Sequence, residues 1–190
     1  MRVIGGLAKG RRVKAPKGHA LRPTADRVKE ALFNILPHDL SGTRVLDLFA
    51  GTGNLSLEAL SRGAAEAMLV DESRGARKTI EENLRTLGLK ERSQVWTAPV
   101  IRALRMLGRK GERFDLIFLD PPYDKNLVEP TLRAIAKEAL LRQTGTVIAE
   151  HSVREKVEER YGAITLQDQR RYGATMLSFF GCDQAEKTAK

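Results

Sequence analysis

The sequence predicts an α/β protein in which a mostly parallel sheet carries helices on both of its faces. Three observations lead to this prediction. From residue 43 onward, short apolar runs alternate with amphipathic segments. A glycine turn follows the first apolar run, and the motif Asp120-Pro121-Pro122-Tyr123 follows the fourth. Both motifs come directly after an expected strand, at the edge where open α/β sheets bind ligands.

The first 29 residues combine turn signals with most of the net charge of the chain. Gly5-Gly6 and Pro16-Lys17-Gly18 frame short apolar segments, which predicts a small basic β-hairpin over residues 1–20. Nine basic side chains oppose a single acid, Asp26, so eight of the nine net positive charges lie here. This distribution predicts a polyanionic partner, and the alternative is a disordered basic arm that keeps the protein soluble. The expected contacts are Arg2, Lys9, Arg11, Arg12, Lys14, Lys17, Arg22 and Arg27.

A helix is expected next, over residues 24–36. Thr24 can cap its N-terminus, apolar residues recur along it at helical spacing, and Pro37 follows its last turn. The regular alternation of the α/β pattern begins after this helix. Strands are expected over residues 43–49, 66–71, 93–98, 114–119 and 144–150, and helices over residues 54–62, 74–87, 99–108 and 126–140.

The chain closes with two further β segments, residues 162–169 and 174–180. They surround the turn Tyr172-Gly173, which predicts an antiparallel hairpin. Residues 182–190 are polar and are expected to form a disordered tail.

The glycine turn has the properties of a ligand cradle. A dinucleotide-binding turn would have a third glycine where Ser56 stands, and Gly53-Asn54-Leu55 is not the ending of a phosphate-binding loop. Asp47 precedes the glycines and suits a ligand with a cationic end, such as the amino group of a methionine moiety. Asp71 ends the next apolar run, where such folds place an acid on ribose hydroxyls. We therefore predict a nucleoside ligand that a side chain at Gly53 would block, and the alternative is a turn that only caps a helix.

The motif Asp120-Pro121-Pro122-Tyr123 describes a pocket for a planar molecule with an exocyclic amine. The Asp120 carboxylate can accept hydrogen bonds from an amino group. Pro121 offers a carbonyl acceptor without a competing N–H donor, and Tyr123 offers a flat face for stacking. The alternative is a strand that stops at a proline turn, with Asp120 as a turn former.

The amino-acid composition indicates the class of protein and the cellular compartment to expect. A hydrophobic fraction of 42% with a mean hydropathy of −0.34 predicts a soluble globular protein, without a membrane span or a secretory signal. One cysteine, Cys182, excludes an internal disulfide and fits a reducing cytoplasm. With three histidines and that single thiol, we expect no metal site.

Together, these motifs resemble the S-adenosylmethionine site of the class I methyltransferases. Over residues 1 to about 181, the chain resembles the bacterial 16S rRNA (guanine(966)-N(2))-methyltransferase family. The opening Arg2-Val3-Ile4-Gly5-Gly6 resembles that family's opening, and the stretch from Arg22 to Leu36 is the most specific part of the match. The resemblance implies a single Rossmann-like domain over residues 1–181, with a seven-stranded sheet and a catalytic core over 43–181.

By the same resemblance the cofactor is S-adenosylmethionine and the substrate is the N2 amine of one guanine of 16S rRNA, presented in the small ribosomal subunit to a monomeric enzyme. The expected cofactor contacts are Thr24, Asp47, Phe49, Ala50, Gly51, Thr52, Gly53, Asp71, Glu72 and Ala98, and the expected catalytic residues are Asp120, Pro121, Pro122 and Tyr123. Related enzymes often have an Asp or Asn after the third strand for the adenine. Here Trp96-Thr97-Ala98-Pro99 stands there, so we expect the adenine contacts to come from the backbone.

Three alternatives remain open. An amino-methyltransferase acting on DNA adenine or cytosine shares the cofactor and the motif, but it usually needs a further target-recognition segment. A glutamine-methylating enzyme would favour Asn over Asp at position 120. An inactive basic module that binds ribosomes is disfavoured by the intact glycine turn and by Asp120 and Tyr123.

Overall fold

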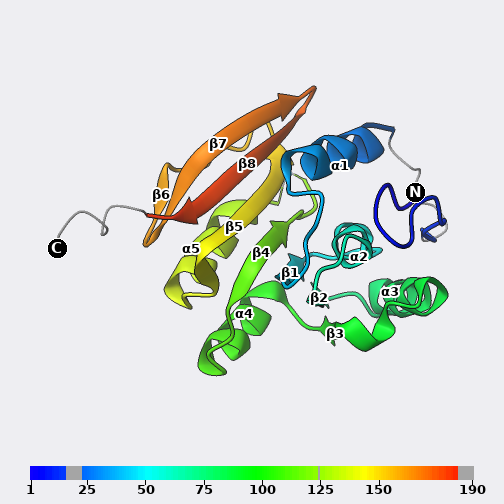
Figure 1. Ribbon diagram of the computed structural model, residues 1–190. Helices are drawn as coiled ribbons and strands as arrows, with labels where there is room; N and C mark the ends of the chain where they lie inside the picture. The colour runs from blue at the N-terminus through cyan, green and yellow to red at the C-terminus, as the bar shows by residue number, and fades with distance from the viewer. Residues whose placement is uncertain (16–22, 124, 184–190) are drawn as a thin grey trace. The chain divides into compact units, whose positions relative to one another are not determined.

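The computed structural model describes residues 1–15, 23–123 and 125–183, with the backbone alone for residues 23–25. The chain forms two compact units, Met1–Val100 and Ile101–Lys190. Strands and helices alternate up to residue 152, as predicted for an α/β protein, and only strands follow within the described residues (Figure 1). The expected single domain over residues 1–181 stays a prediction.

Three parallel strands form the sheet of the first unit. They are β1 (Arg44–Leu48), β2 (Glu66–Asp71) and β3 (Ser93–Thr97), with β2 in the middle. The apolar residues of β1 and β2 are buried along their whole length, as expected for strands covered on both faces. Asp71 is opposite Thr97 in the register, so the carboxyl ends of β2 and β3 meet at one edge.

The helices of the first unit agree with the sequence prediction within about two residues. They are α1 (Pro23–Ile35), α2 (Asn54–Ser61) and α3 (Arg74–Leu87), followed by the 3-10 turn η1 (Lys90–Arg92). Helix α1 begins at Pro23, because proline suits the first helical position, where the N–H has no helical partner. Thr24 therefore lies inside the first turn and does not precede the helix.

The N-terminal residues pair only briefly with one another. Arg2 and Arg12 form an isolated antiparallel bridge, and the Val3 N–H donates to the Arg11 carbonyl over 3.0 Å. The Gly10 N–H donates back to the Val3 carbonyl at 2.9 Å, but the N–H groups of residues 4, 5, 7 and 8 donate to Glu58 and Ser61 of α2. The predicted hairpin is therefore a bridged loop over the residues described, and its expected end, residues 16–20, lies outside them.

Five strands form the sheet of the second unit, in the order β4-β5-β8-β7-β6. They are β4 (Phe114–Leu119), β5 (Leu141–Ser152), β6 (Arg160–Tyr161), β7 (Ile164–Tyr172) and β8 (Thr175–Cys182). The β4–β5 pair is parallel, and the other pairs are antiparallel. The two-residue β6 is the strand that brings the described total to eight instead of the expected seven. Cys182, expected in a disordered tail, is the last residue of β8, and residues 184–190 lie outside the description.

Helices α4 (Val100–Arg109) and α5 (Val128–Lys137) complete the second unit. Helix α5 is shorter at both ends than predicted. Asn126 and Ala139 have left-handed φ angles of 50° and 49°, which no helix can continue through. In the part of the chain that the structure describes, no helix has the length and apolarity needed to cross a membrane.

Candidate active site

Asp47 is a carboxylate buried inside the first unit. It lies on β1 with 2% of its surface exposed, and Ser56 of α2 donates to its Oδ2 from the backbone N–H at 3.2 Å and from Oγ at 2.8 Å. Burial raises the pKa of Asp47 to about 7, although the Ser56 hydrogen bonds act in the opposite direction. No ion pair joins Asp47 to a cation among the described residues, so the site favours a ligand that brings a positive charge.

The two glycines of the turn meet different surroundings. Both have left-handed φ angles, 57° at Gly51 and 77° at Gly53. A Cβ on Gly51 would approach only the Phe49 carbonyl, at 3.9 Å, so the backbone there borders open space. A Cβ on Gly53 would lie 3.0 Å from the Leu69 side chain, which is buried. Gly51 therefore leaves room for a ligand, and a Cβ at Gly53 would first meet the core. The expectation that a side chain at Gly53 would block the ligand stays a prediction.

Asp71 fixes the shape of this turn. Its Oδ2 accepts the Gly51 N–H at 2.9 Å, and its Oδ1 accepts the Ser73 N–H at 2.8 Å, at the start of α3. Its carbonyl accepts the Ala98 N–H at 3.1 Å. Each carboxylate oxygen has a second lone pair, so Asp71 can hold the turn and still accept a hydrogen bond from a ligand hydroxyl.

Thr97 is a candidate contact that sequence reasoning missed. Its Oγ1 is buried and has no hydrogen-bond partner among the described residues. Buried hydroxyls are nearly always paired, so this one fits a position where a bound molecule supplies the partner. The available signal was a hydroxyl at the carboxyl end of β3, next to the predicted contact Ala98 and opposite Asp71.

The remaining predicted cofactor residues lie around the same turn. The Ala50 N–H donates to the Val70 carbonyl at 3.0 Å, and the Asn83 amide donates to the Thr52 carbonyl at 3.1 Å, which fixes the backbone on both sides of Gly51. Phe49 has a φ of 63°, which is strained for a bulky residue. Such strained backbone conformations are often found at functional sites. Glu72 is exposed directly after β2. The Thr24 side chain lies outside the description.

The motif Asp120-Pro121-Pro122-Tyr123 follows β4 in the second unit. Asp120 and Pro122 are exposed, Pro121 is buried, and Tyr123 is half-buried. The Tyr123 hydroxyl donates to Glu150 Oε1 over 3.0 Å and lies 3.0 Å from Thr175 Oγ1. Burial raises the pKa of Tyr123 to about 12 and also raises the pKa of Glu150. The ring is therefore held at its far end by β5 and β8, while Asp120 and Pro122 of the motif stay open to solvent.

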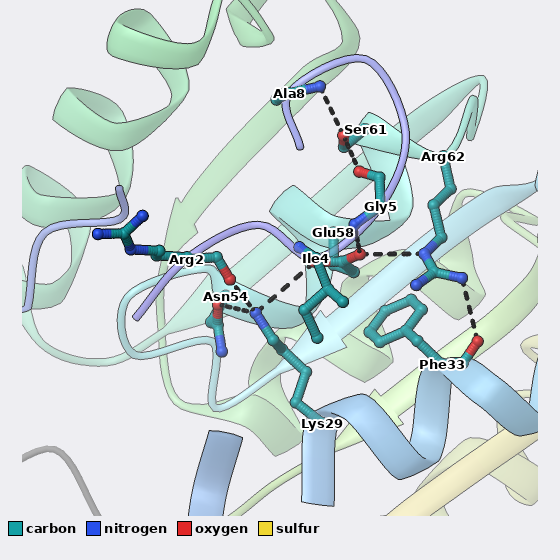
Figure 2. A network of polar contacts seen from close by, with 10 residues as sticks. All are labelled: Arg2, Ile4, Gly5, Ala8, Lys29, Phe33, Asn54, Glu58, Ser61 and Arg62. Carbon is teal, nitrogen blue, oxygen red and sulfur yellow. Dashed lines mark hydrogen bonds and ion pairs between the residues drawn. The ribbon is translucent and has the colours of Figure 1, made fainter. Parts of the chain in front are cut away.

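The N-terminal segment, residues 1–14, is seated on a buried carboxylate of α2. Glu58 is fully buried and accepts the N–H groups of Ile4 and Gly5, each over 2.8 Å (Figure 2). Arg62 donates to the same carboxylate over 3.0 Å, and it also donates to the Phe33 carbonyl over 3.0 Å. The backbone of the segment thereby replaces water around a buried ion pair.

Two further contacts complete this seat. Ser61 Oγ accepts the Ala8 N–H at 2.9 Å and donates to the Gly5 carbonyl over 2.6 Å. The buried Lys29 ammonium of α1 donates to the Arg2 carbonyl over 2.6 Å and to Asn54 Oδ1 over 2.9 Å (Figure 2). Burial lowers the pKa of Lys29, and the neighbouring Glu58 partly offsets this effect. The segment is therefore joined to α1 and to the first residue of α2.

The basic residues expected to contact a polyanion fall into three groups. The Arg11 guanidinium donates to the Thr86 and Leu87 carbonyls, and Lys14 pairs with Glu82, so both lie against α3. The side chains of the second group are exposed and have no hydrogen bond or ion pair within the described part of the chain. This second group is Arg2, Lys9, Arg12 and, on α1, Arg27. The third group, Lys17 and Arg22, lies outside the description.

No cluster of three or more potential metal ligands occurs among residues 1–15, 23–123 and 125–183.

The chain is similar to several known proteins. The model of a family described as Conserved hypothetical protein 95 matches residues 1–181. The Bacillus subtilis protein named "Putative rRNA methyltransferase YlbH" is 39% identical over 180 residues, which are 95% of this chain and 98% of that protein.

Two further comparisons concern Escherichia coli. The protein named ribosomal RNA small subunit methyltransferase D is 37% identical over 155 residues, which are 80% of this chain and 75% of that protein. The solved structure named "Putative methyltransferase yhhF" superposes with a TM-score of 0.81 at 32% identity, and the match covers 96% of this chain and 98% of that one.

Proposed function

The chain belongs to the family of the ribosomal RNA small subunit methyltransferase D enzymes, and from this membership we propose that it methylates the exocyclic N2 amine of one guanine of 16S rRNA. The predicted class I methyltransferase fold is confirmed by the same relatives. The proposed target is guanine-966, the nucleotide in the name of the 16S rRNA methyltransferase family that the sequence resembles. The observation that carries the proposal is the motif Asp120–Tyr123, in which an anchored aromatic ring follows two hydrogen-bond acceptors.

The first unit fits S-adenosylmethionine, which supplies a methyl group on a positively charged sulfur. Asp47 is a buried carboxylate without a cationic partner among the described residues, and it would hold the ammonium of the methionine part. The open backbone at Gly51 would border the same part, and Asp71 would accept from the ribose hydroxyls. The buried Thr97 hydroxyl would meet the adenine.

The second unit offers what an aromatic amine needs in order to react. The lone pair of the guanine N2 amine is conjugated with the ring, so the amine is a weak nucleophile. Hydrogen bonds from its two hydrogens to the Asp120 carboxylate and the Pro121 carbonyl favour a pyramidal nitrogen with a free lone pair. Stacking on Tyr123, whose hydroxyl is held by Glu150 and Thr175, fixes the plane of the base. Asp120 is exposed, so the released proton can reach solvent.

The RNA must supply the base in an unstacked form, which costs a few kcal/mol. The exposed cations of the N-terminal segment provide affinity for the phosphate backbone, and the pocket provides the choice of base. Because the segment is anchored on Glu58, its cations are presented on an ordered loop.

The substrate is tested by incubating the protein with tritiated S-adenosylmethionine and with small ribosomal subunits, naked 16S rRNA or DNA. The labelled nucleotide is then mapped. Asp120→Asn should lower single-turnover transfer by roughly 10²–10³-fold, the usual loss for one stabilising hydrogen-bond group. Cofactor affinity, measured by calorimetry, should stay near the wild-type value. Asp168→Asn is the matched control, because it neutralises an exposed carboxylate of β7 that pairs only at the surface with Arg170.

Transfer by Asp120→Asn within a few-fold of wild type would remove Asp120 from the reaction. Label found in DNA, or on a nucleotide other than guanine, would replace the proposed substrate.

A further inference from the structure

Helix α4 carries three arginines on one side. Arg102, Arg105 and Arg109 follow the spacing that brings residues to the same face of a helix, and all three are exposed. The opposite face of the helix is fully buried and apolar. It consists of Ala103, Leu104 and Leu107. We refer to Arg102, Arg105 and Arg109 as the α4 arginine face.

The arginines of this face belong, with Arg2, Arg12 and Arg27, to the exposed arginines whose side chains lack a partner among the described residues. None of the three makes a hydrogen bond or an ion pair with a residue in the described ranges. Several other exposed arginines do pair with carboxylates, as do Arg77 with Glu81 at 2.8 Å and Arg133 with Glu129 at 2.8 Å. The Glu138 carboxylate lies beside Gly108 on α4, but it forms no ion pair with the three arginines.

An apolar strip runs between the charges. Met106 is 38% exposed, and together with the half-buried Ile101 it lines a surface hollow with the three arginines. Three cations around an apolar floor suit a partner that carries both phosphate groups and apolar sugar or base surfaces. A nucleic acid strand has this combination, and guanidinium groups match phosphate geometry with paired hydrogen bonds.

From these observations we propose that the α4 arginine face binds the sugar–phosphate backbone of the 16S rRNA, at a segment other than the one held by the N-terminal residues. The identity of the RNA rests on the proposed function. The three arginines span about 10 Å along the helix axis at the usual rise per residue, so they can follow a strand over more than one phosphate. Their mutual repulsion in the free protein is relieved when a polyanion binds.

The sequence did not indicate this face because the charge count hides it. Beyond residue 29 the chain is nearly neutral, since 24 basic residues face 23 acidic ones. In this count the arginines of α4 are balanced by carboxylates that the fold places elsewhere, several of which are already paired with other cations.

The test compares two triple variants that lose the same charge. The first is Arg102→Gln with Arg105→Gln and Arg109→Gln, and the control is Arg77→Gln with Arg133→Gln and Arg170→Gln, three exposed arginines that already have carboxylate partners. Affinity for naked 16S rRNA and for small subunits is measured over a range of salt concentrations. The α4 variant should lower the log–log salt slope by roughly 0.7–0.9 for each phosphate that is no longer bound, and the control should lower it by less than the amount for one phosphate.

Thermal melting verifies that both variants fold. Equal slopes for the α4 variant and the control would overturn the proposal. If the α4 variant lost affinity only for intact subunits and bound naked RNA as wild type does, the face would bind an acidic ribosomal protein. That result would also overturn the proposal. Methyl transfer by the wild-type protein is recorded in parallel: its absence would refute the proposed function, while the salt slopes would still show whether the face binds RNA.

Discussion

At the scale of single residues, the glycine turn separates two roles that the sequence pattern combines. Gly51 and Gly53 both need a left-handed backbone, but only Gly51 borders open space. A substitution at Gly51 therefore tests the ligand cradle, whereas a substitution at Gly53 tests packing against Leu69.

We predict that Gly51→Ala lowers the affinity for S-adenosylmethionine by roughly 10–200-fold, the range that one methylene-sized group gives in a tight pocket. The backbone strain should cost about 1–2 kcal/mol of unfolding free energy. Calorimetry and urea unfolding measure the two effects. Gly42→Ala is the matched control, because Gly42 also has a left-handed φ, 78°, with nothing within 4 Å of its Cβ position. If both variants bind the cofactor as wild type does, the cradle is misplaced.

Asp47 gives the cofactor site a pH dependence. Its pKa is raised to about 7 by burial, so the free protein holds it mostly protonated at pH 6. A cationic ligand prefers the ionised form, so affinity should rise about tenfold per pH unit below 7 and level off above it. Calorimetry between pH 5.5 and about 7.5 avoids the titration of α-amino groups near 8. Asp47→Asn should show a flat profile, and a flat wild-type profile would contradict the role of Asp47.

The same ionisation affects stability with the opposite sign. An acid whose folded pKa lies above its unfolded value of 3.8 destabilises the folded state as pH rises between the two values. The unfolding free energy of the free wild type, relative to Asp47→Asn, should therefore fall from about pH 4 to pH 7 and stay constant above that.

At the scale of elements, the seat of the N-terminal segment depends on one further glycine. Gly6 has a φ of 72°, and a Cβ there would lie 1.8 Å from the Ser61 carbonyl oxygen. The Leu7 N–H donates to that same oxygen over 2.8 Å, so the loop approaches α2 as closely as its backbone permits.

We expect Gly6→Ala to detach the segment from α2 and to weaken RNA binding, while cofactor affinity stays near wild type. Gly10→Ala is the control, because Gly10 has a φ of 81° and open space around its Cβ position. The control carries the same kind of backbone strain without the collision. Filter binding to 16S rRNA and protease sensitivity of residues 1–14 measure the effect. Equal behaviour of the two variants would show that the seat is not needed for RNA binding.

Most elements could be predicted from the sequence because their signals are local. The bounds of β2, α3 and β4 match the predicted ranges, since apolar runs and helical spacing lie within each segment. The ends of α5 were missed because the left-handed residues Asn126 and Ala139 leave no pattern in composition.

The supports of the site were not predictable, because they join distant segments. Tyr123 is held by Glu150 and Thr175, which are 27 and 52 residues away and belong to different strands. Glu58 has the appearance of an exposed residue of a polar helix face, but the N-terminal segment, Arg62 and Lys29 all lie against its carboxylate. A sequence pattern shows which groups carry chemistry, but not which distant groups orient them.

At the scale of the whole molecule, the net charge of +9 is concentrated near the N-terminus, but the charges there are not equivalent. Arg11 and Lys14 are held against α3 by carbonyls and by Glu82. The side chains of Arg2, Lys9 and Arg12 are exposed and make no hydrogen bond or ion pair inside the described ranges. The second group is therefore available to phosphates.

We predict that Arg2→Gln with Lys9→Gln and Arg12→Gln lowers the log–log salt slope for small-subunit binding by roughly 0.7–0.9 for every phosphate that the variant fails to bind. Arg11→Gln with Lys14→Gln is the comparison, and it should change the slope less, because these charges already have partners in the free protein. Cofactor affinity should stay unchanged in both variants, since none of the five residues lies in the glycine turn. A wild-type slope in the triple variant would mean that the N-terminal cations serve solubility, and the phosphates would then have to be bound by other cations, the α4 arginine face first among them.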